Sequence, residues 1–197
     1  QAAKAANVPK DNIERAVKKG TGELEGGQME EITYEGYGID GIAFMVEVIT
    51  DNKNRALAEI KHVFNKTGGN LATNGAVSWQ FDMKGYIALN NEGIDFDEVF
   101  MVAAEAGAED VVAEEDMIII YTPREMFAAV EQTVSESGYK IAESELRWEP
   151  QNETEQSTDI ALKNMKILDM LEDLDDVQSV SSNLKITDEL ANALETA

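Results

Sequence analysis

The clearest secondary-structure pattern lies in residues 85–148, GYIALNNEGIDFDEVFMVAAEAGAEDVVAEEDMIIIYTPREMFAAVEQTVSESGYKIAESELRW. It predicts the order strand, helix, strand twice in succession. The expected strands are 85–91, 109–113, 117–122 and 139–148, and the expected helices are 95–106 and 123–137. Gly107 and Gly138 stand where helices end, and TPRE (122–125) matches a capping box with proline at the first helical position. This order is typical of a ferredoxin-like βαββαβ domain.

The residues before this segment predict a different arrangement. Strands are expected at 32–37 and 42–50, and a helix at 52–66 closed by Gly68 and Gly69. Residues 75–82, GAVSWQFD, alternate in polarity, which predicts a half-buried strand with Trp79 on its apolar face. We therefore expect Trp79 in the core rather than exposed as a base-stacking platform.

The residues after the segment predict one helix at 158–173 and one strand at 177–186. One helix and one strand cannot form a domain, and the strands of 29–83 lack a second covering helix. We therefore predict an α+β protein in which residues 27–83 and 150–197 form one central α/β domain. Residues 84–149 are then an inserted ferredoxin-like βαββαβ domain. Residues 1–26 are expected to be the end of a truncated helical N-terminal domain and a glycine-rich linker.

The composition limits the classes of function. The net charge of −23 disfavours non-specific binding to polyanions, so contact with nucleic acid requires local basic patches. With one histidine, no cysteine and no recognisable catalytic frame, we expect no enzyme activity, metal or cofactor. The sequence has no apolar run long enough to cross a membrane, and we expect a cytoplasmic protein. The chain starts at Gln1 within a helical pattern, and we expect that part of the natural N-terminus is missing.

Two basic segments stand out from the acidic chain. In the expected helix 52–66, Ala56, Leu57, Ile60, Val63 and Phe64 share the apolar face, and Arg55, Glu59, His62 and Lys66 lie opposite. One interpretation is a solvated face with an Arg55–Glu59 pair; the other is contact with phosphates, helped by donors of the loop TGGNLATNG (67–75). Both remain open, as they do for residues 10–19, whose last two lysines also suit a helix end. The candidate nucleic-acid-binding residues are Lys10, Arg15, Lys18, Lys19, Lys53, Arg55, Lys61, His62, Lys66 and Asn70.

Several separate blocks carry a resemblance to a known family. They are PKDNIERAVKKGTGE, YEGYGIDGIA, TDNKNRALAEIKHVFNKTGGNLATNGAVSWQF, AAEAGAEDV and MLEDLDDVQSV, in order between residue 9 and residue 180. In these blocks the chain resembles the YebC family, whose bacterial members are called probable transcriptional regulators. The family includes the mitochondrial translational activator of cytochrome c oxidase. The resemblance implies a helical N-terminal domain, a central α/β domain and an α/β domain inserted in it. Members normally carry a longer Lys/Arg-rich segment before the first block, which is absent here.

The resemblance also implies a function, a DNA-binding regulator of transcription. The alternative is a ribosome-associated translation factor, a translational activator that relieves ribosome stalling and binds ribosomal RNA. The acidic inserted domain could meet a protein partner, and the sequence does not indicate an oligomeric state. On this basis, reversing the charge of Arg55, Lys61 and Lys66 should weaken binding without lowering thermal stability.

Overall fold

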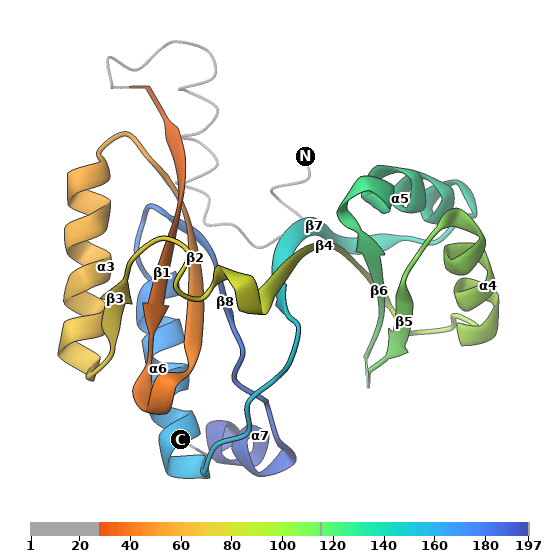
Figure 1. Ribbon diagram of the computed structural model, residues 1–197. Coiled ribbons are helices and arrows are strands. Elements are labelled where there is room, and N and C mark those ends of the chain that lie inside the picture. Colours follow the sequence, from red (N-terminus) through yellow and green to blue (C-terminus); the bar gives the residue numbers. More distant parts are fainter. Residues whose placement is uncertain (1–27, 115, 197) are drawn as a thin grey trace. The chain divides into compact units, whose positions relative to one another are not determined.

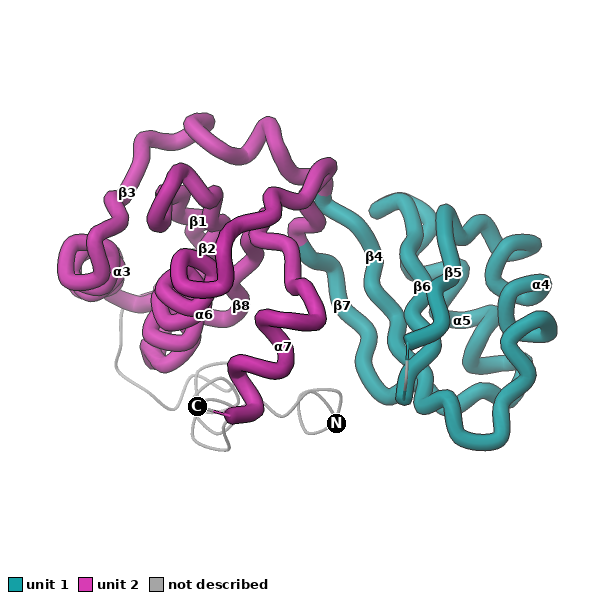
Figure 2. Tube along the Cα trace, turned by 90° about the horizontal axis from the view of Figure 1, so that it is seen from below, with its two compact units in different colours: residues 1–24, 83–147 teal, residues 25–82, 148–197 magenta. Residues whose placement is uncertain are grey.

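The structure, a computed structural model, describes residues 28–114 and 116–196 (Figure 1). These residues form an α+β protein with five α-helices and two four-stranded sheets. They divide into two units (Figure 2), one of residues 83–147 and the other of residues 28–82 with 148–196. The second unit is therefore built from two stretches of chain that are far apart in the sequence.

The unit of residues 83–147 has a sheet in the order β5-β6-β4-β7. Its elements are β4 (Phe81–Asn90), α4 (Phe96–Ala106), β5 (Asp110–Ala113), β6 (Met117–Pro123), α5 (Phe127–Glu136) and β7 (Ile141–Pro150). The two middle strands are antiparallel, with Tyr86 opposite Tyr121. Apolar residues at alternate positions of β4 and β6, such as Ile87 and Ile120, pack with Val99 of α4 and Val130 of α5. Both helices therefore cover one face of this sheet.

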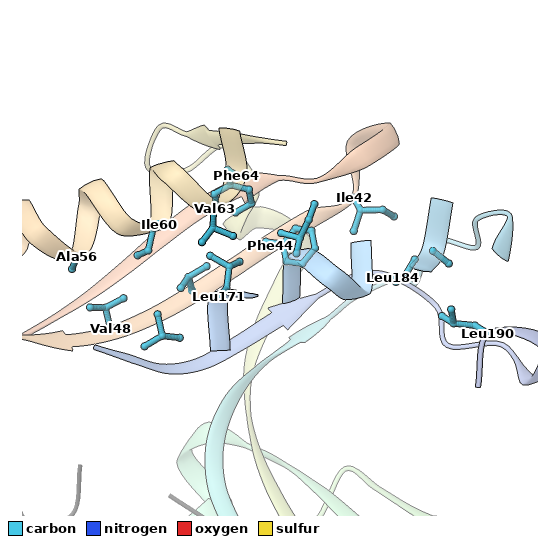
Figure 3. Close-up of a cluster of buried hydrophobic side chains, with 14 residues drawn as sticks. Ile42, Phe44, Val48, Ala56, Ile60, Val63, Phe64, Leu171, Leu184 and Leu190 are labelled. Atoms are coloured by element: carbon cyan, nitrogen blue, oxygen red, sulfur yellow. The ribbon is translucent and has the colours of Figure 1, made fainter. Parts of the chain in front are cut away.

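The other unit has a sheet in the order β3-β1-β2-β8, and its strands pair antiparallel. Its elements are β1 (Glu30–Tyr37), β2 (Ala43–Thr50), α3 (Lys53–Thr67), β3 (Asn70–Ala72), α6 (Thr158–Glu172), β8 (Val177–Ser182) and α7 (Asp188–Glu195). Strand β2 is apolar at nearly every position because both of its faces are covered. One face carries Ile42, Phe44, Val46 and Val48 and packs against α3 and α6. Figure 3 shows the inner side chains of α3 directed toward those of β2 and α6.

Helix α3 lies very close to the sheet at one point. A Cβ atom built on Gly36 of β1 would overlap the ring of Phe64, which is fully buried. Phe64 in turn makes an edge contact with Phe44, with ring centroids 6.0 Å apart. The missing side chain at Gly36 thus allows Phe64 to reach the sheet, and this contact fixes the C-terminal half of α3 over β1.

The prediction of a strand at 75–82 with Trp79 in the core is wrong. Residues Ser78–Gln80 form a 3₁₀ turn, β4 begins at Phe81, and the side chain of Trp79 is 70% exposed. Val77 and Phe81, which alternate with Trp79 in the sequence, are buried against Ala43 and Met45 on the second face of the sheet. A 3₁₀ turn has three residues per turn rather than two, so it sends the residue between two inward side chains outward.

Four smaller expectations also fail. The TPRE segment is not a capping box, because Thr122 is buried in β6 and its hydroxyl donates to the Pro123 carbonyl. A 3₁₀ turn, Arg124–Met126, follows, and α5 begins only at Phe127. Leu57, assigned to the apolar face of α3, is 37% exposed because it lies at the margin of that face. The last strand ends at Ser182 and is followed by α7, which was not predicted. Asn70–Ala72 forms a short strand on β1 where a loop was expected.

Candidate nucleic-acid interface

Helix α3 carries most of the described candidate residues, and local sequence sets both of its ends. The Asn52 side chain accepts a hydrogen bond from the Arg55 amide at 3.1 Å, which is an N-cap. Gly68 ends the helix in the left-handed conformation with φ of 88°. Ala56, Ile60, Val63 and Phe64 are buried, so the remaining faces present the basic side chains to solvent.

Two of the predicted basic residues are engaged by carboxylates. Lys53 forms an ion pair with Glu30 at 2.5 Å. Arg55 donates from Nη2 to Asp176 at 2.7 Å and to Asp51 at 3.0 Å, and from Nε to Asp176 at 3.2 Å. Arg55 therefore pairs with Asp51 and Asp176, and not with Glu59 as one interpretation expected. These bonds, from Asp176 first, raise the pKa of Arg55 above its ordinary value.

Asp176 was not singled out from the sequence. It belongs to the acidic run Glu172–Asp176, where the helix predicted at 158–173 was expected to end, and α6 does end at Glu172. Asp176 itself is buried, and it accepts a hydrogen bond from the Thr50 hydroxyl at 2.9 Å in addition to those from Arg55. It thereby ties the end of β2 and the start of α3 to the segment before β8. No local pattern indicates this, because Asp176 and Arg55 are far apart in sequence.

Two lysines and the histidine remain on the solvent side of α3. Lys61, His62 and Lys66 are exposed. Within residues 28–114 and 116–196, no carboxylate forms an ion pair with Lys61 or Lys66. Asn70 is exposed at the start of β3, opposite Tyr37 of β1. The predicted residues Lys10, Arg15, Lys18 and Lys19, and the expected N-terminal domain, lie outside the described residues.

Several backbone donors in and just after the loop 67–75 are used within the protein. The amides of Gly68 and Gly69 both donate to the Phe64 carbonyl. Those of Gly75, Val77 and Ser78 all donate to the carboxylate of Glu35, at 2.6, 2.7 and 2.9 Å. These five amides are therefore not available to bind a phosphate.

Glu35 is the second buried acid that sequence reasoning missed. It lies on β1 and is only 3% exposed, and its carboxylate accepts hydrogen bonds from backbone amides of the loop. Burial raises the pKa of Glu35, but the hydrogen bonds from Gly75, Val77 and Ser78 outweigh it and leave the pKa below its ordinary value. Because these amides point toward the Glu35 carboxylate, they cannot pair with a neighbouring strand, which explains why residues 75–80 do not form one.

Residues 28–114 and 116–196 carry neither a membrane span nor a metal site. No helix there is long and apolar enough to cross a membrane. No group of three or more His, Asp or Glu side chains in the same residues is placed to hold a metal ion.

Comparison with known proteins places this chain in a family. The family described as TACO1/YebC second and third domain matches residues 29–184. A probable transcriptional regulatory protein of Desulforapulum autotrophicum is 48% identical over 193 residues, covering 98% of this chain and 78% of that protein. One of Syntrophus aciditrophicus is 47% identical over 194 residues, with the same coverage. The crystal structure of a conserved hypothetical protein from Aquifex aeolicus superposes with a TM-score of 0.83 at 44% identity, covering 96% of this chain and 78% of that one. The chain therefore belongs to the TACO1/YebC family.

Proposed function

We propose that this protein is a non-enzymatic regulator of gene expression that binds DNA, with the solvent side of α3 as one contact to the phosphate backbone. The relatives named probable transcriptional regulatory proteins support a role in regulation. The basic side chains of α3 support a nucleic acid as the partner. Binding of this kind positions the protein on the backbone and does not by itself read sequence.

One observation carries the proposal. Lys61 and Lys66 are exposed and form no ion pair with a described carboxylate, although the chain has 39 acidic residues against 16 basic ones. Lys53 and Arg55 on the same helix are paired. Two such lysines, five residues apart on the helix, can each neutralise one phosphate and release its counterion.

Charge reversal of Lys61 and Lys66 tests this contact. We expect the double variant Lys61→Glu, Lys66→Glu to bind duplex DNA about tenfold more weakly, because two phosphate contacts are lost. The slope of log K against log salt should fall in magnitude by about two. Mobility shift across a salt series measures both quantities, and Arg55 is left out of the variant because its side chain holds Asp176.

A matched control comes from α6. Lys163 and Lys166 are also exposed, and Lys163→Glu, Lys166→Glu changes the total charge equally. Equal losses of affinity in the two double variants would show that the α3 lysines are ordinary solvent-exposed residues without a specific role in binding.

Ribosome co-sedimentation over the same salt series tests the other polyanion, ribosomal RNA. Binding to ribosomes with no retention of DNA would overturn the choice of DNA in favour of ribosomal RNA.

We also infer that residues 84–149 are a ferredoxin-like domain inserted into the central domain. The strand order β5-β6-β4-β7 with two helices on one face supports this. This segment has 16 acidic and four basic residues. Such a charge repels a polyanion, so a protein is the partner it suits best.

A further inference from the structure

Trp79 is the most exposed large apolar side chain of the described chain, at 70%. Its one polar group is nevertheless already bonded, because the indole Nε1 donates to the Ala76 carbonyl at 3.0 Å. The indole therefore has no hydrogen bond left to offer, and what it presents to solvent is the ring itself. An exposed aromatic ring of this kind costs hydrophobic free energy unless something covers it.

The ring stands on a fixed support. The backbone of the loop is held by the three hydrogen bonds to the buried Glu35 carboxylate. The Tyr37 hydroxyl donates to the same Ala76 carbonyl at 3.1 Å, and Val77 and Phe81 on either side of the 3₁₀ turn are buried. A partner would therefore meet a ring that is already positioned and would lose little entropy in ordering it.

The neighbours of Trp79 on this loop indicate which partner it suits. Thr73, Asn74 and Ser78 are polar, Gly75 has no side chain, and Trp79 is the one exposed large apolar side chain within residues 73–82, so the loop offers a single flat ring rather than a broad apolar patch. Protein hot spots are typically seated among other apolar contacts. An unpaired nucleobase needs only one flat π surface, and stacking on an aromatic side chain tolerates any base.

We propose that Trp79 is a stacking platform for an unpaired base of single-stranded nucleic acid. This inference rests on the proposed function, and it adds a contact to bases that the lysines of α3 cannot make. A paired base within a duplex has both faces covered by its neighbours, so the ring selects single strands or locally opened ones.

Fluorescence provides a direct test, since the chain has two tryptophans. In the full chain carrying Trp148→Phe, Trp79 is the sole indole. A single-stranded 12-mer oligodeoxynucleotide should quench its emission as it binds, because a stacked base quenches an indole. An abasic oligonucleotide of the same length, carrying a dye for anisotropy, should bind through its phosphates without quenching.

Affinity supplies the second measurement. We expect Trp79→Ala to weaken binding of the single-stranded 12-mer about tenfold and Trp79→Phe to weaken it less, since phenylalanine keeps a smaller ring. Binding of the abasic oligonucleotide should be unchanged. The midpoint of urea unfolding should be close to that of the parent, because the ring is exposed.

The outcomes separate this inference from the proposed function. Anisotropy that shows binding of the 12-mer without quenching, or with equal affinity for Trp79→Ala, overturns the stacking platform alone. Equal losses for duplex and single strand would also overturn it. If neither of these oligonucleotides binds but duplex DNA does, the inference alone fails. If duplex DNA does not bind either at any salt concentration, the proposed function fails together with the inference.

Discussion

Replacing Glu35 with alanine is expected to lower the free energy of unfolding by about 3 kcal/mol, because three backbone amides lose a charged acceptor. The amide of Val77 lies in a buried position, so water cannot simply replace the carboxylate there. Residues 73–80 should lose their fixed conformation. Urea unfolding measures the stability, and hydrogen exchange should show lost protection at Gly75, Val77 and Ser78.

The stability lost in this variant should depend on pH. The pKa of Glu35 is lower in the folded protein than its ordinary value of 4.5. A carboxyl group with a depressed pKa stabilises the fold fully above the pKa of the unfolded chain, and this stabilisation is lost as the pH falls through the folded pKa. The difference between parent and Glu35→Ala should thus be constant from neutral pH to about pH 5.5 and should shrink below about pH 4.5.

Glu31 provides the control for Glu35. It lies on the same strand and is exposed, so Glu31→Ala removes a carboxylate of the same type without removing loop contacts. Its effect on the free energy of unfolding should stay within about 0.5 kcal/mol. If Glu35→Ala unfolds at the same urea concentration as Glu31→Ala, the buried carboxylate does not hold the loop.

Replacing Arg55 with alanine is expected to lower the free energy of unfolding by about 2 kcal/mol. Asp176 would keep only the Thr50 hydroxyl as a side-chain partner, while its own side chain stays about 90% buried. A buried carboxylate deprived of its cation is costly, whereas the partial exposure of Arg55 keeps this cost below that of a fully buried pair. Thermal or urea unfolding measures the loss.

Lys66→Ala is the comparison for Arg55. It removes a cation from the same helix that has no ion pair with a described carboxylate, so stability should change by less than about 0.5 kcal/mol. Equal stabilities of the two variants would show that Arg55 is not structural. In that case the expectation from the sequence, that reversing the charge of Arg55 does not lower thermal stability, would be correct.

Most secondary structure could be predicted because its signals are local. The cap at Asn52, the glycine at 68 and the apolar spacing from Ala56 to Phe64 all lie within one segment, and α3 forms over Lys53–Thr67. The continuous apolar run of β2 likewise indicates a strand covered on both faces. A short strand such as Asn70–Ala72 gives no comparable signal, because its pairing with β1 supplies the order.

The candidate site was predicted less well, since its partners come from distant segments. The sequence identified the cations of α3 but could not distinguish Arg55 from Lys66. Arg55 is bonded to Asp176, whereas Lys66 forms no ion pair within the part of the chain that the structure describes. Alternation placed Trp79 inside, and nothing within residues 75–82 reveals that Glu35, some 40 positions earlier, would take their amides.

The α+β class, the positions of most helices and strands, and the gathering of basic residues on one helix of an acidic chain could all be predicted from the sequence. These properties depend on periodicity, caps and composition, which act over a few residues. The packed structure was needed to show that Glu35 binds the amides of the loop, that Asp176 binds Arg55, and that Trp79 faces solvent. Each of these depends on a charge buried by one segment and satisfied by another, and burial is a property of the packed chain rather than of any one segment.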